Sequence, residues 1–382
     1  MTISFIKKRF SFHGGAEKYL QTLIEHLKRN SHDIHIYANR WSEEKGITLH
    51  KIPLLPLGSL LSALSFDYNV KKTLKQNPSA GCIISFERTT CQDIYRAGDG
   101  CHREWLILRK CIEPHWRRLT FRINPLHRGL LSLEKRLFEE TKLIIANSQM
   151  VKKQIIHHYH LSEEKISVIY NGVDLQRFSP FNRNIYRDAI RKELSIPEKA
   201  KVILFVGSGF ERKGLLTLFR ALPALKKNTA PGDIRLLVIG QGNKRKFTSF
   251  SVKYGIEDSV LFLGPRDHVE QFYSAADVFV LPTIYDPFSN ATIEAMASGL
   301  PVITTAHNGA SEIVDDGVDG FLLHNILDYN ELSLKIMLAL SRSVVMGENA
   351  RLKAEKYPIE RAVKEFTTIL TNYKAFAGDR LP

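Results

Sequence analysis

Residues 277–311 read DVFVLPTIYDPFSNATIEAMASGLPVITTAHNGAS. The apolar run Val278–Leu281 indicates a buried strand, and Val302–Thr305 indicates a second one. Between them lie a proline-containing turn and helix-type spacing that stops at Gly299. A strand, a loop and a helix that lead to another strand are typical of a parallel α/β sheet.

Two carboxylates, Asp286 and Glu294, bracket the point at which this loop becomes a helix. The backbone amides of Ser289, Asn290 and Ala291 lie between them. The first turn of a helix attracts anions because its amide groups lack partners and the helix dipole is positive there. The stretch therefore predicts an anion site flanked by two acidic side chains.

The same alternation of short apolar runs with helical periodicity continues along the chain. Further strands are expected at Ile3–Ile6, Ile34–Tyr37, Cys82–Phe86, Leu143–Ala146, Ile166–Tyr170, Val202–Val206, Leu236–Ile239 and Val260–Leu263. A chain of 382 residues is too long for one ordinary core, so two domains are expected. Each half is predicted to be a doubly wound, Rossmann-like unit that binds ligands outside the carboxyl ends of its strands.

The first domain is predicted to span residues 1–175 and the second residues 176–354. A helix over residues 355–382 is expected to complete the first domain. The polar residues 179–200, which include two prolines, are expected to hold the crossing between the domains and a short helix.

The composition suggests an acidic partner, because the formal net charge is +14 and the pI is about 9.5. Nucleic acid, anionic lipid and a phosphorylated substrate all fit, as does a merely soluble basic surface. The cysteines are spaced by nine or ten residues, which does not resemble paired zinc ligands, and free thiols are expected at Cys82, Cys91, Cys101 and Cys111. No signal-peptide pattern and no apolar run of about eighteen residues occur, so a cytoplasmic protein is expected, soluble or held at a membrane face.

Residues 103–128 interrupt the α/β pattern with REWLILRKCIEPHWRRLTFRINPLHR. Seven arginines and lysines face only Glu104 and Glu113, and tryptophan and leucine are interleaved with them. This mixture suits the surface of an anionic bilayer. Membrane contact is expected through Arg103, Trp105, Arg109, Lys110, Trp116, Arg117 and Arg118. The alternative is an exposed helix pair packed on its domain, and nucleic-acid binding is disfavoured because no motif for it accompanies the charge.

The segment GSGFERKG, residues 207–214, resembles two phosphate-binding loops but satisfies neither. Leu215 stands where a P-loop needs lysine, and Arg212 stands where the third glycine of G-x-G-x-x-G belongs. What remains is Arg212 and Lys213 at a strand-to-helix turn, where two cations can neutralise a diphosphate without metal. The alternative is a solvated surface pair. No D-x-D motif occurs in the chain, so no metal is expected.

Five ordered segments together carry a family resemblance: HGGAEKYLQTLIEHLKR, VIYNGVDLQRFSP, FVGSGFERKG, VIGQGN and SAADVFVLPTIYDPFSNATIEAMASGLPVITT. The chain resembles the retaining glycosyltransferases of family 4 over nearly its whole length. The resemblance implies the GT-B architecture, in which two Rossmann-like domains face each other across a cleft. Within the family it is strongest to the enzymes that add the first outer-core glucose to lipopolysaccharide, whose basic, aromatic insert contacts the membrane.

The resemblance also implies roles for the donor-side residues. The backbone at Gly14 and Gly15 would lie near the donor diphosphate and sugar. Arg212 and Lys213 would bind the diphosphate, together with the amides of Ser289, Asn290 and Ala291. Arg266 would lie at the base, Glu294 would accept hydrogen bonds from the ribose hydroxyls, and Arg177 would reach the phosphate or the acceptor side.

Three residues are expected to act on the transfer itself. Lys213 would stabilise the departing diphosphate. Asp286 takes the first place of the family's E-x7-E motif and would contact the sugar hydroxyls. Because it is one methylene shorter than glutamate, either the loop comes closer to the sugar or the donor sugar differs. Asp99, in IYRAGDGCH, would orient or deprotonate the acceptor hydroxyl, with His102 as an alternative and a turn-forming role for Asp99 also open.

The expected activity is the retaining transfer of a hexose, glucose foremost, from UDP to a heptose of the lipopolysaccharide core. It would occur at the anionic cytoplasmic face of the inner membrane, with a UDP-sugar as donor and no cofactor, metal or nucleic acid. The alternatives are a family-4 transferase that acts on exopolysaccharide or a lipid-linked sugar, a GT-B epimerase or hydrolase of nucleotide sugars, and a basic binding protein without activity.

Overall fold

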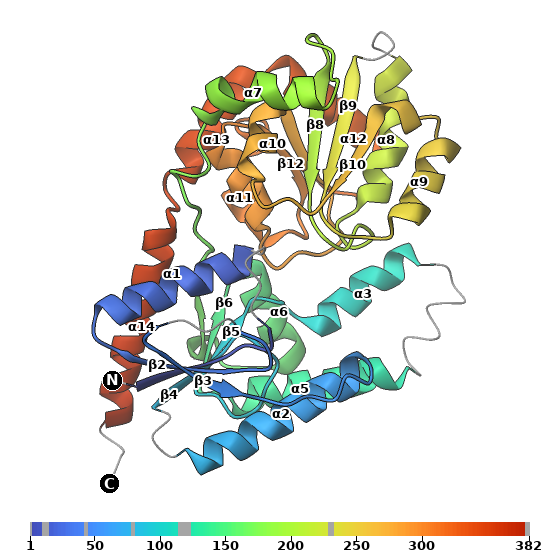
Figure 1. The fold of residues 1–382 in the computed structure, drawn as a ribbon. Helices are drawn as coiled ribbons and strands as arrows, with labels where there is room; N and C mark the ends of the chain where they lie inside the picture. The colour runs from blue at the N-terminus through green and yellow to red at the C-terminus, as the bar shows by residue number, and fades with distance from the viewer. Residues whose placement is uncertain are drawn as a thin grey trace. The chain divides into compact units, whose positions relative to one another are not determined.

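The computed structural model describes residues 2–9, 15–41, 45–77, 81–113, 124–227 and 233–378, which form two compact units (Figure 1). Unit 1 comprises residues 1–170 and 362–382, and unit 2 comprises residues 171–361. The chain therefore enters unit 2 after Tyr170, five residues before the expected limit and well before residues 179–200. It returns to unit 1 within the last helix, α14 (Ile359–Gly378), seven residues after the expected limit.

In the described part of unit 1, a seven-stranded parallel sheet has the order β3-β2-β1-β4-β5-β6-β7. Its strands are β1 (Thr2–Ile6), β2 (Asp33–Ala38), β3 (Ile47–Lys51), β4 (Cys82–Ser85), β5 (Ile94–Ala97), β6 (Leu143–Ala146) and β7 (Ile166–Val168), and a short 3₁₀ turn, Glu163–Lys165, precedes β7. The order reverses between β1 and β4, which makes their carboxyl ends the switch point of the sheet.

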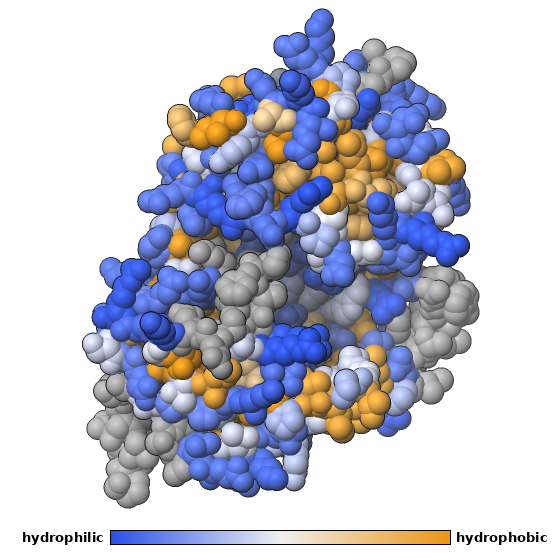
Figure 2. Space-filling view, viewed as in Figure 1, coloured by the Kyte–Doolittle hydropathy of each residue, from blue (hydrophilic) through white to orange (hydrophobic). Residues whose placement is uncertain are grey.

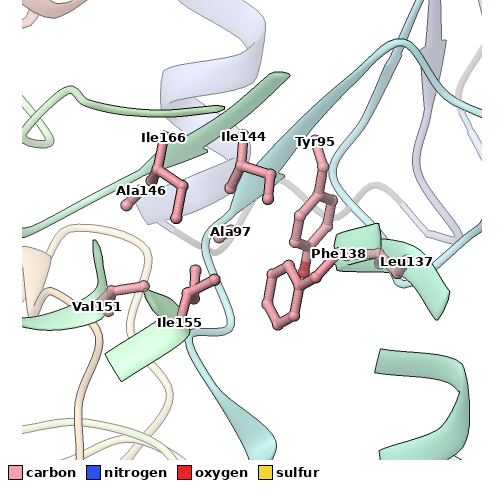
Figure 3. Packing of buried hydrophobic residues seen from close by; sticks show 9 residues of the cluster. All are labelled: Tyr95, Ala97, Leu137, Phe138, Ile144, Ala146, Val151, Ile155 and Ile166. Atoms are coloured by element: carbon pink, nitrogen blue, oxygen red, sulfur yellow. The ribbon is translucent and has the colours of Figure 1, made fainter. Parts of the chain in front are cut away.

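Helices cover both faces of this sheet. One face carries α1 (Gly15–Arg29) and α14, whose rings Tyr19 and Phe366 lie edge to face at 6.5 Å. The other carries α2 (Gly58–Gln76), α5 (Pro125–Glu140) and α6 (Gln149–Tyr159). Figure 3 shows the core under α5 and α6, where Tyr95 and Phe138 pack against aliphatic residues of β6 and α6. A further helix, α3 (His102–Ile112), follows β5.

Unit 2 contains a six-stranded parallel sheet in the described residues, with the order β10-β9-β8-β11-β12-β13. Its strands are β8 (Lys201–Val206), β9 (Ile234–Ile239), β10 (Val260–Gly264), β11 (Val278–Leu281), β12 (Val302–Thr305) and β13 (Gly320–Leu323). Its helices are α7 (Asn182–Glu193), α8 (Leu215–Lys227), α9 (Lys244–Lys253), α10 (Glu270–Ala275), α11 (Asn290–Ala297), α12 (Tyr329–Ser341) and α13 (Ser343–Ala354), with 3₁₀ turns at Glu257–Ser259 and Gly309–Ile313. The switch point of this Rossmann-like order lies between β8 and β11.

The expected strands are confirmed, and three further strands complete the sheets. β3 is a partly exposed edge strand, β5 carries the buried Arg96, and β13 begins at Gly320. Polar residues interrupt the sequences of β3 and β5, and the apolar run of β13 is only three residues long, Phe321–Leu323.

Residues 179–200 lie within unit 2 because α7 is anchored there by charge. Asp277, which is 6% exposed, pairs with Arg183, Arg187 and Arg191, one from each turn of α7, at 3.1, 2.8 and 3.4 Å. Its second oxygen also accepts a hydrogen bond from the Val202 amide at 2.8 Å. A tertiary contact therefore makes a polar segment part of a domain rather than a linker.

Replacement of Asp277 by alanine is expected to lower the free energy of unfolding of unit 2 by about 3–5 kcal/mol, because three partly buried guanidinium groups lose the carboxylate that they share. Urea denaturation measures the loss. The exposed Asp258→Ala should change stability by no more than about 0.5 kcal/mol. A loss below about 1 kcal/mol for Asp277→Ala would show that the arginines find other acceptors.

Candidate functional site

Two loops meet at the switch point of unit 2. They follow β8 (residues 207–214) and β11 (residues 282–289) and are named here the switch-point loops. Gly214 has a φ of +77°, and a Cβ atom there would overlap the carbonyl group of Pro282. Only glycine allows so close an approach. The carbonyl oxygen of Arg212 accepts hydrogen bonds from the Ile284 amide at 2.9 Å and from the Thr283 hydroxyl at 3.0 Å.

The two loops are also joined by a buried ion pair between Lys213 Nζ and Asp286 Oδ2. Lys213 is 9% exposed and Asp286 is 5% exposed. Burial lowers the pKa of Lys213, and the negative charge of Asp286 opposes that shift. The neighbouring Arg212 directs its Nη1 to the Tyr285 carbonyl at 2.8 Å. A lysine, an arginine and a carboxylate thus converge at the carboxyl ends of two adjacent strands.

Asn308, which is fully buried, holds the loop after β11 in place. Its Oδ1 accepts from the amides of Ser289 and Ala310, both at 3.1 Å, and its Nδ2 donates to Thr292 and Thr304 at 3.1 and 2.9 Å. The amide of Ser289 is therefore engaged by the protein itself. Of the three amides expected to face an anion, those of Asn290 and Ala291 remain in the first turn of α11, where intrahelical partners are lacking.

Glu294 lies one turn further along α11. Its Oε2 accepts a hydrogen bond of 3.0 Å from the Tyr273 hydroxyl. Burial raises the pKa of Glu294, while Tyr273, Arg177 and Lys213 act in the opposite direction. Lys213 and Glu294 are therefore within electrostatic range of each other, as the expected donor site requires.

The two remaining arginines of the expected donor site lie around α10. Arg177 forms an ion pair of 2.8 Å with Glu270 and donates to the Asp267 carbonyl at 2.6 Å. Arg266 is exposed in the loop after β10, with its guanidinium 5.7 Å from the centre of the Phe272 ring. Arg177 is electrostatically coupled to Glu294. The structure thus brings Arg177 to the same side of unit 2 as the switch-point loops.

In unit 1, Asp99 follows β5 and its side chain is 61% exposed. An oxygen of its carboxylate lies 3.6 Å from Nη1 of Arg88, a largely buried residue just after β4. Arg88 Nε lies 3.7 Å from Glu134. Burial lowers the pKa of Arg88, but Asp99, Tyr95 and Glu134 outweigh it and raise the pKa overall. A guanidinium at the switch point of unit 1 therefore holds the candidate acceptor-side carboxylate.

Glu134 connects this pair to the helices around it. It is 1% exposed and accepts hydrogen bonds from the His102 and Arg103 amides at 2.7 and 3.2 Å, at the start of α3. The Tyr159 hydroxyl of α6 donates to it at 2.5 Å. A carboxylate at a helix N-terminus satisfies free amides and complements the dipole. Sequence reasoning missed both Arg88 and Glu134. The one available signal was the position of Arg88 directly after an apolar strand.

Two family models match consecutive parts of this chain. The one described as "Glycosyltransferase Family 4" matches residues 13–177, and the one described as "Glycosyl transferases group 1" matches residues 186–358. The lipopolysaccharide glucosyltransferase WaaG of Escherichia coli K12 is 25% identical over 97% of this chain and 99% of its own. The crystal structure of WaaG superposes with a TM-score of 0.83 over 97% of this chain and 99% of that one. The chain is a GT-B glycosyltransferase of family 4.

Other relatives match a smaller part of the chain or have a lower sequence identity. A D-inositol 3-phosphate glycosyltransferase of Corynebacterium kroppenstedtii is 29% identical over 62% of this chain. The match covers 54% of the length of that relative. Anabaena HepE, solved in complex with UDP-glucose, is 19% identical with a TM-score of 0.74 over 97% of the transferase and 100% of that chain. At that identity the likeness concerns the fold alone.

The remaining expected residues of the transferase lie in unit 1. Gly15 is the first residue of α1, and Gly14 lies outside the described residues. His102 is the first residue of α3, and burial, reinforced by Arg88, lowers its pKa to about 4. His102 is half-buried and neutral at pH 7, whereas Asp99 is exposed. Of the two, Asp99 is therefore the group that an acceptor can reach more easily.

The basic residues of α3 are partly engaged within unit 1. Arg103 donates to the His158 carbonyl at 3.3 Å, and Arg109 pairs with Glu113 at 3.1 Å while lying 6.0 Å from the centre of the Trp105 ring. Lys110 is partly exposed. Trp116, Arg117 and Arg118 lie outside the described residues. Across the described ranges, no helix has the length and apolar character to cross a bilayer, and no group of three or more His, Cys, Asp or Glu side chains is placed to hold a metal ion.

The lowered pKa of His102 predicts a pH dependence of stability. Between pH 6.5 and about 4 the unfolded chain takes up a proton at His102 that the folded chain refuses, so stability falls as the pH falls. The wild-type protein should lose stability between about pH 7 and pH 5. In His102→Gln this loss, measured by urea denaturation, should be smaller by about 1 kcal/mol, after allowance for the partial exposure of His102. The exposed His324→Gln should keep the wild-type dependence; an unchanged dependence in His102→Gln would refute the assignment.

Proposed function

We propose that the transferase moves a hexose, with glucose as the first candidate, from UDP to a heptose of the lipopolysaccharide core with retention of configuration. The observation that carries the proposal is the buried pair of Lys213 and Asp286 at the carboxyl ends of β8 and β11. Ligands of doubly wound sheets bind at this point. The likeness to WaaG over nearly the full length of both chains supports the choice of reaction.

The charges of unit 2 suit a nucleotide diphosphate. Lys213 and Arg212 offer two cations, and the first-turn amides of Asn290 and Ala291 offer further donors. Glu294, an acceptor held by Tyr273, suits the ribose hydroxyls. Anabaena HepE, which shares the fold, binds UDP-glucose. No metal is needed in this arrangement, because the cations of the chain balance the diphosphate.

The transfer would proceed by stabilisation of the leaving group. The bond between the anomeric carbon and the β-phosphate oxygen breaks, and its electron pair stays with UDP. The acceptor oxygen bonds to the same carbon on the same face, and its proton passes to Asp99 or to the departing phosphate oxygen. Negative charge then grows on the phosphate oxygens, where Lys213 and Arg212 would stabilise it and so lower the barrier. Asp286 would face the sugar, and Arg88 would orient Asp99.

The proposed acceptor is supported by the surface chemistry of the chain and by its likeness to WaaG. WaaG acts in lipopolysaccharide biosynthesis. A lipid-held acceptor would place this enzyme at the anionic cytoplasmic face of the inner membrane. Residues 103–128 supply the basic and aromatic side chains for such a contact.

Removal of the Lys213 charge should weaken UDP binding. A charge-assisted hydrogen bond contributes about 1.5–3 kcal/mol, so Lys213→Met should raise the Kd for UDP about 10–100-fold and abolish most of the thermal stabilisation by UDP. Asp286→Asn should keep the Kd for UDP within about 3-fold but lower kcat for the UDP-sugar at least about 10-fold, since it would act on the sugar. Calorimetry and a coupled UDP-release assay measure the two effects.

Lys246→Met is the matched control, because Lys246 is an exposed lysine of α9 that pairs with Glu211 at 3.1 Å. It should leave both constants unchanged. If Lys213→Met binds UDP as tightly as the wild type, the donor site lies elsewhere and the proposal fails.

A panel of UDP-sugars with truncated core lipopolysaccharide as acceptor tests the substrates. Transfer of glucose to a heptose supports the proposal. Transfer only to exopolysaccharide or lipid-linked acceptors identifies a different member of the family, and UDP-sugar turnover at full rate without acceptor identifies a hydrolase or epimerase.

A further inference from the structure

An apolar stripe on α2 is exposed to solvent. It consists of Leu55, Leu57, Leu61, Leu64 and Tyr68, which are 52, 66, 47, 41 and 67% exposed and are named here the α2 stripe. Leu61, Leu64 and Tyr68 share one face of α2 because they are spaced by three and four residues, whereas Leu55 and Leu57 belong to the segment that leads into the helix. The opposite face packs Ala63, Phe66 and Val70 into the core. The helix is therefore apolar on its solvent side as well as on its core side.

The stripe belongs to a larger apolar area. Figure 2 shows apolar side chains gathered where Figure 1 places the first halves of α2 and α5. Leu60 of α2 lies against Gly129 of α5, where a Cβ atom would come within 2.6 Å of Leu60 Cδ1. The other side of α5 contacts α3. The stripe thus adjoins, through α5, the helix expected to contact a membrane.

The exposed charge on α2 and on the segment before it is positive. Between Gly46 and Phe86 the sequence contains Lys51, Lys71, Lys72 and Lys75 but only one acidic residue, Asp67. Asp67 is 7% exposed and accepts hydrogen bonds from the Thr90 amide and hydroxyl at 2.7 and 3.0 Å. Its charge is therefore used inside the fold, and the exposed charges of this segment are all positive.

We propose that the α2 stripe is a second bilayer-contacting surface, in which Leu57, Leu61 and Tyr68 enter the interface and Lys72 and Lys75 meet anionic headgroups. Exposed leucines beside lysines, without exposed acids, have the chemistry of interfacial helices. The rim of a protein–protein interface is polar without a fixed sign of charge, so a single positive sign favours an anionic surface as the partner. The inference rests on the proposed function in one respect: an enzyme whose acceptor is held by lipid has to attach to the membrane. It can be tested without any transfer reaction.

The test uses the full chain in flotation with vesicles of phosphatidylethanolamine and phosphatidylglycerol. Leu57→Ser with Leu61→Ser should lower the partition coefficient at least about 10-fold at both low and high salt, because apolar insertion is not screened. Lys72→Gln with Lys75→Gln should lower it about 10-fold at low salt and little at high salt, because headgroup attraction is screened.

Matched controls lie on unit 2. Val344 and Val345 of α13 are 72 and 57% exposed, and their double serine variant should partition like the wild type. Lys192→Gln with Lys199→Gln, two exposed lysines outside the α2 region, removes the same charge and should also have little effect. UDP affinity and the melting temperature, measured without vesicles, should be unchanged in the α2 variants, which separates this proposal from the proposed function.

Several results would overturn the inference. Wild-type partition of the Leu57→Ser, Leu61→Ser variant is one, and an equal loss in the valine control is another. A change in oligomeric state by light scattering, with vesicle binding intact, would assign the stripe to contact with a second protein chain instead. Loss of vesicle binding only on Arg103→Gln with Lys110→Gln would leave α3 as the sole membrane contact.

Discussion

The buried ion pair between Lys213 and Asp286 is the interaction on which the site in unit 2 depends. Each charge loses much of its water on burial, and the opposite charge offsets part of that cost. Gly214 and the carbonyl oxygen of Arg212 bring the loops close enough for the pair to form. The cation is thus fixed at the switch point before any ligand binds, so little reorganisation is needed during transfer.

The shorter acidic side chain at position 286 fits this geometry. The Asp286 amide donates to the His307 carbonyl at 2.9 Å, and its carbonyl accepts from the Gly309 amide at 2.8 Å. Asn308, between these partners, fixes the start of α11 through the Ser289 amide. The backbone of the loop is therefore tied to the segment after β12, and an aspartate is long enough to reach Lys213.

Much of the fold could be predicted from sequence, because central parallel strands are continuous apolar runs and Gly299 marks a helix end. The limits of the units could not, since α7 is placed by three arginines that meet one aspartate 86 to 94 residues away. Motifs in the sequence single out Lys213 and Asp286 as candidates for a donor site, but they do not predict that the two side chains form an ion pair. Lys213 and Asp286 lie 73 residues apart, and the Ser289 amide is engaged by Asn308, which no motif indicates. Arg88 and Glu134 were missed because only the fold brings them together.

The distribution of charge separates two kinds of electrostatics in this protein. The net charge is +14, yet Lys213, Arg177 and the α7 arginines each face a carboxylate within their own unit. The pair of Lys213 and Asp286 is shielded from salt by burial, so this interaction should depend weakly on ionic strength. The uncompensated charge lies instead on exposed side chains such as Lys72 and Lys75, where it acts through solvent and is strongly screened. Catalysis and attachment to a charged surface can therefore respond independently to salt, because they draw on different sets of residues.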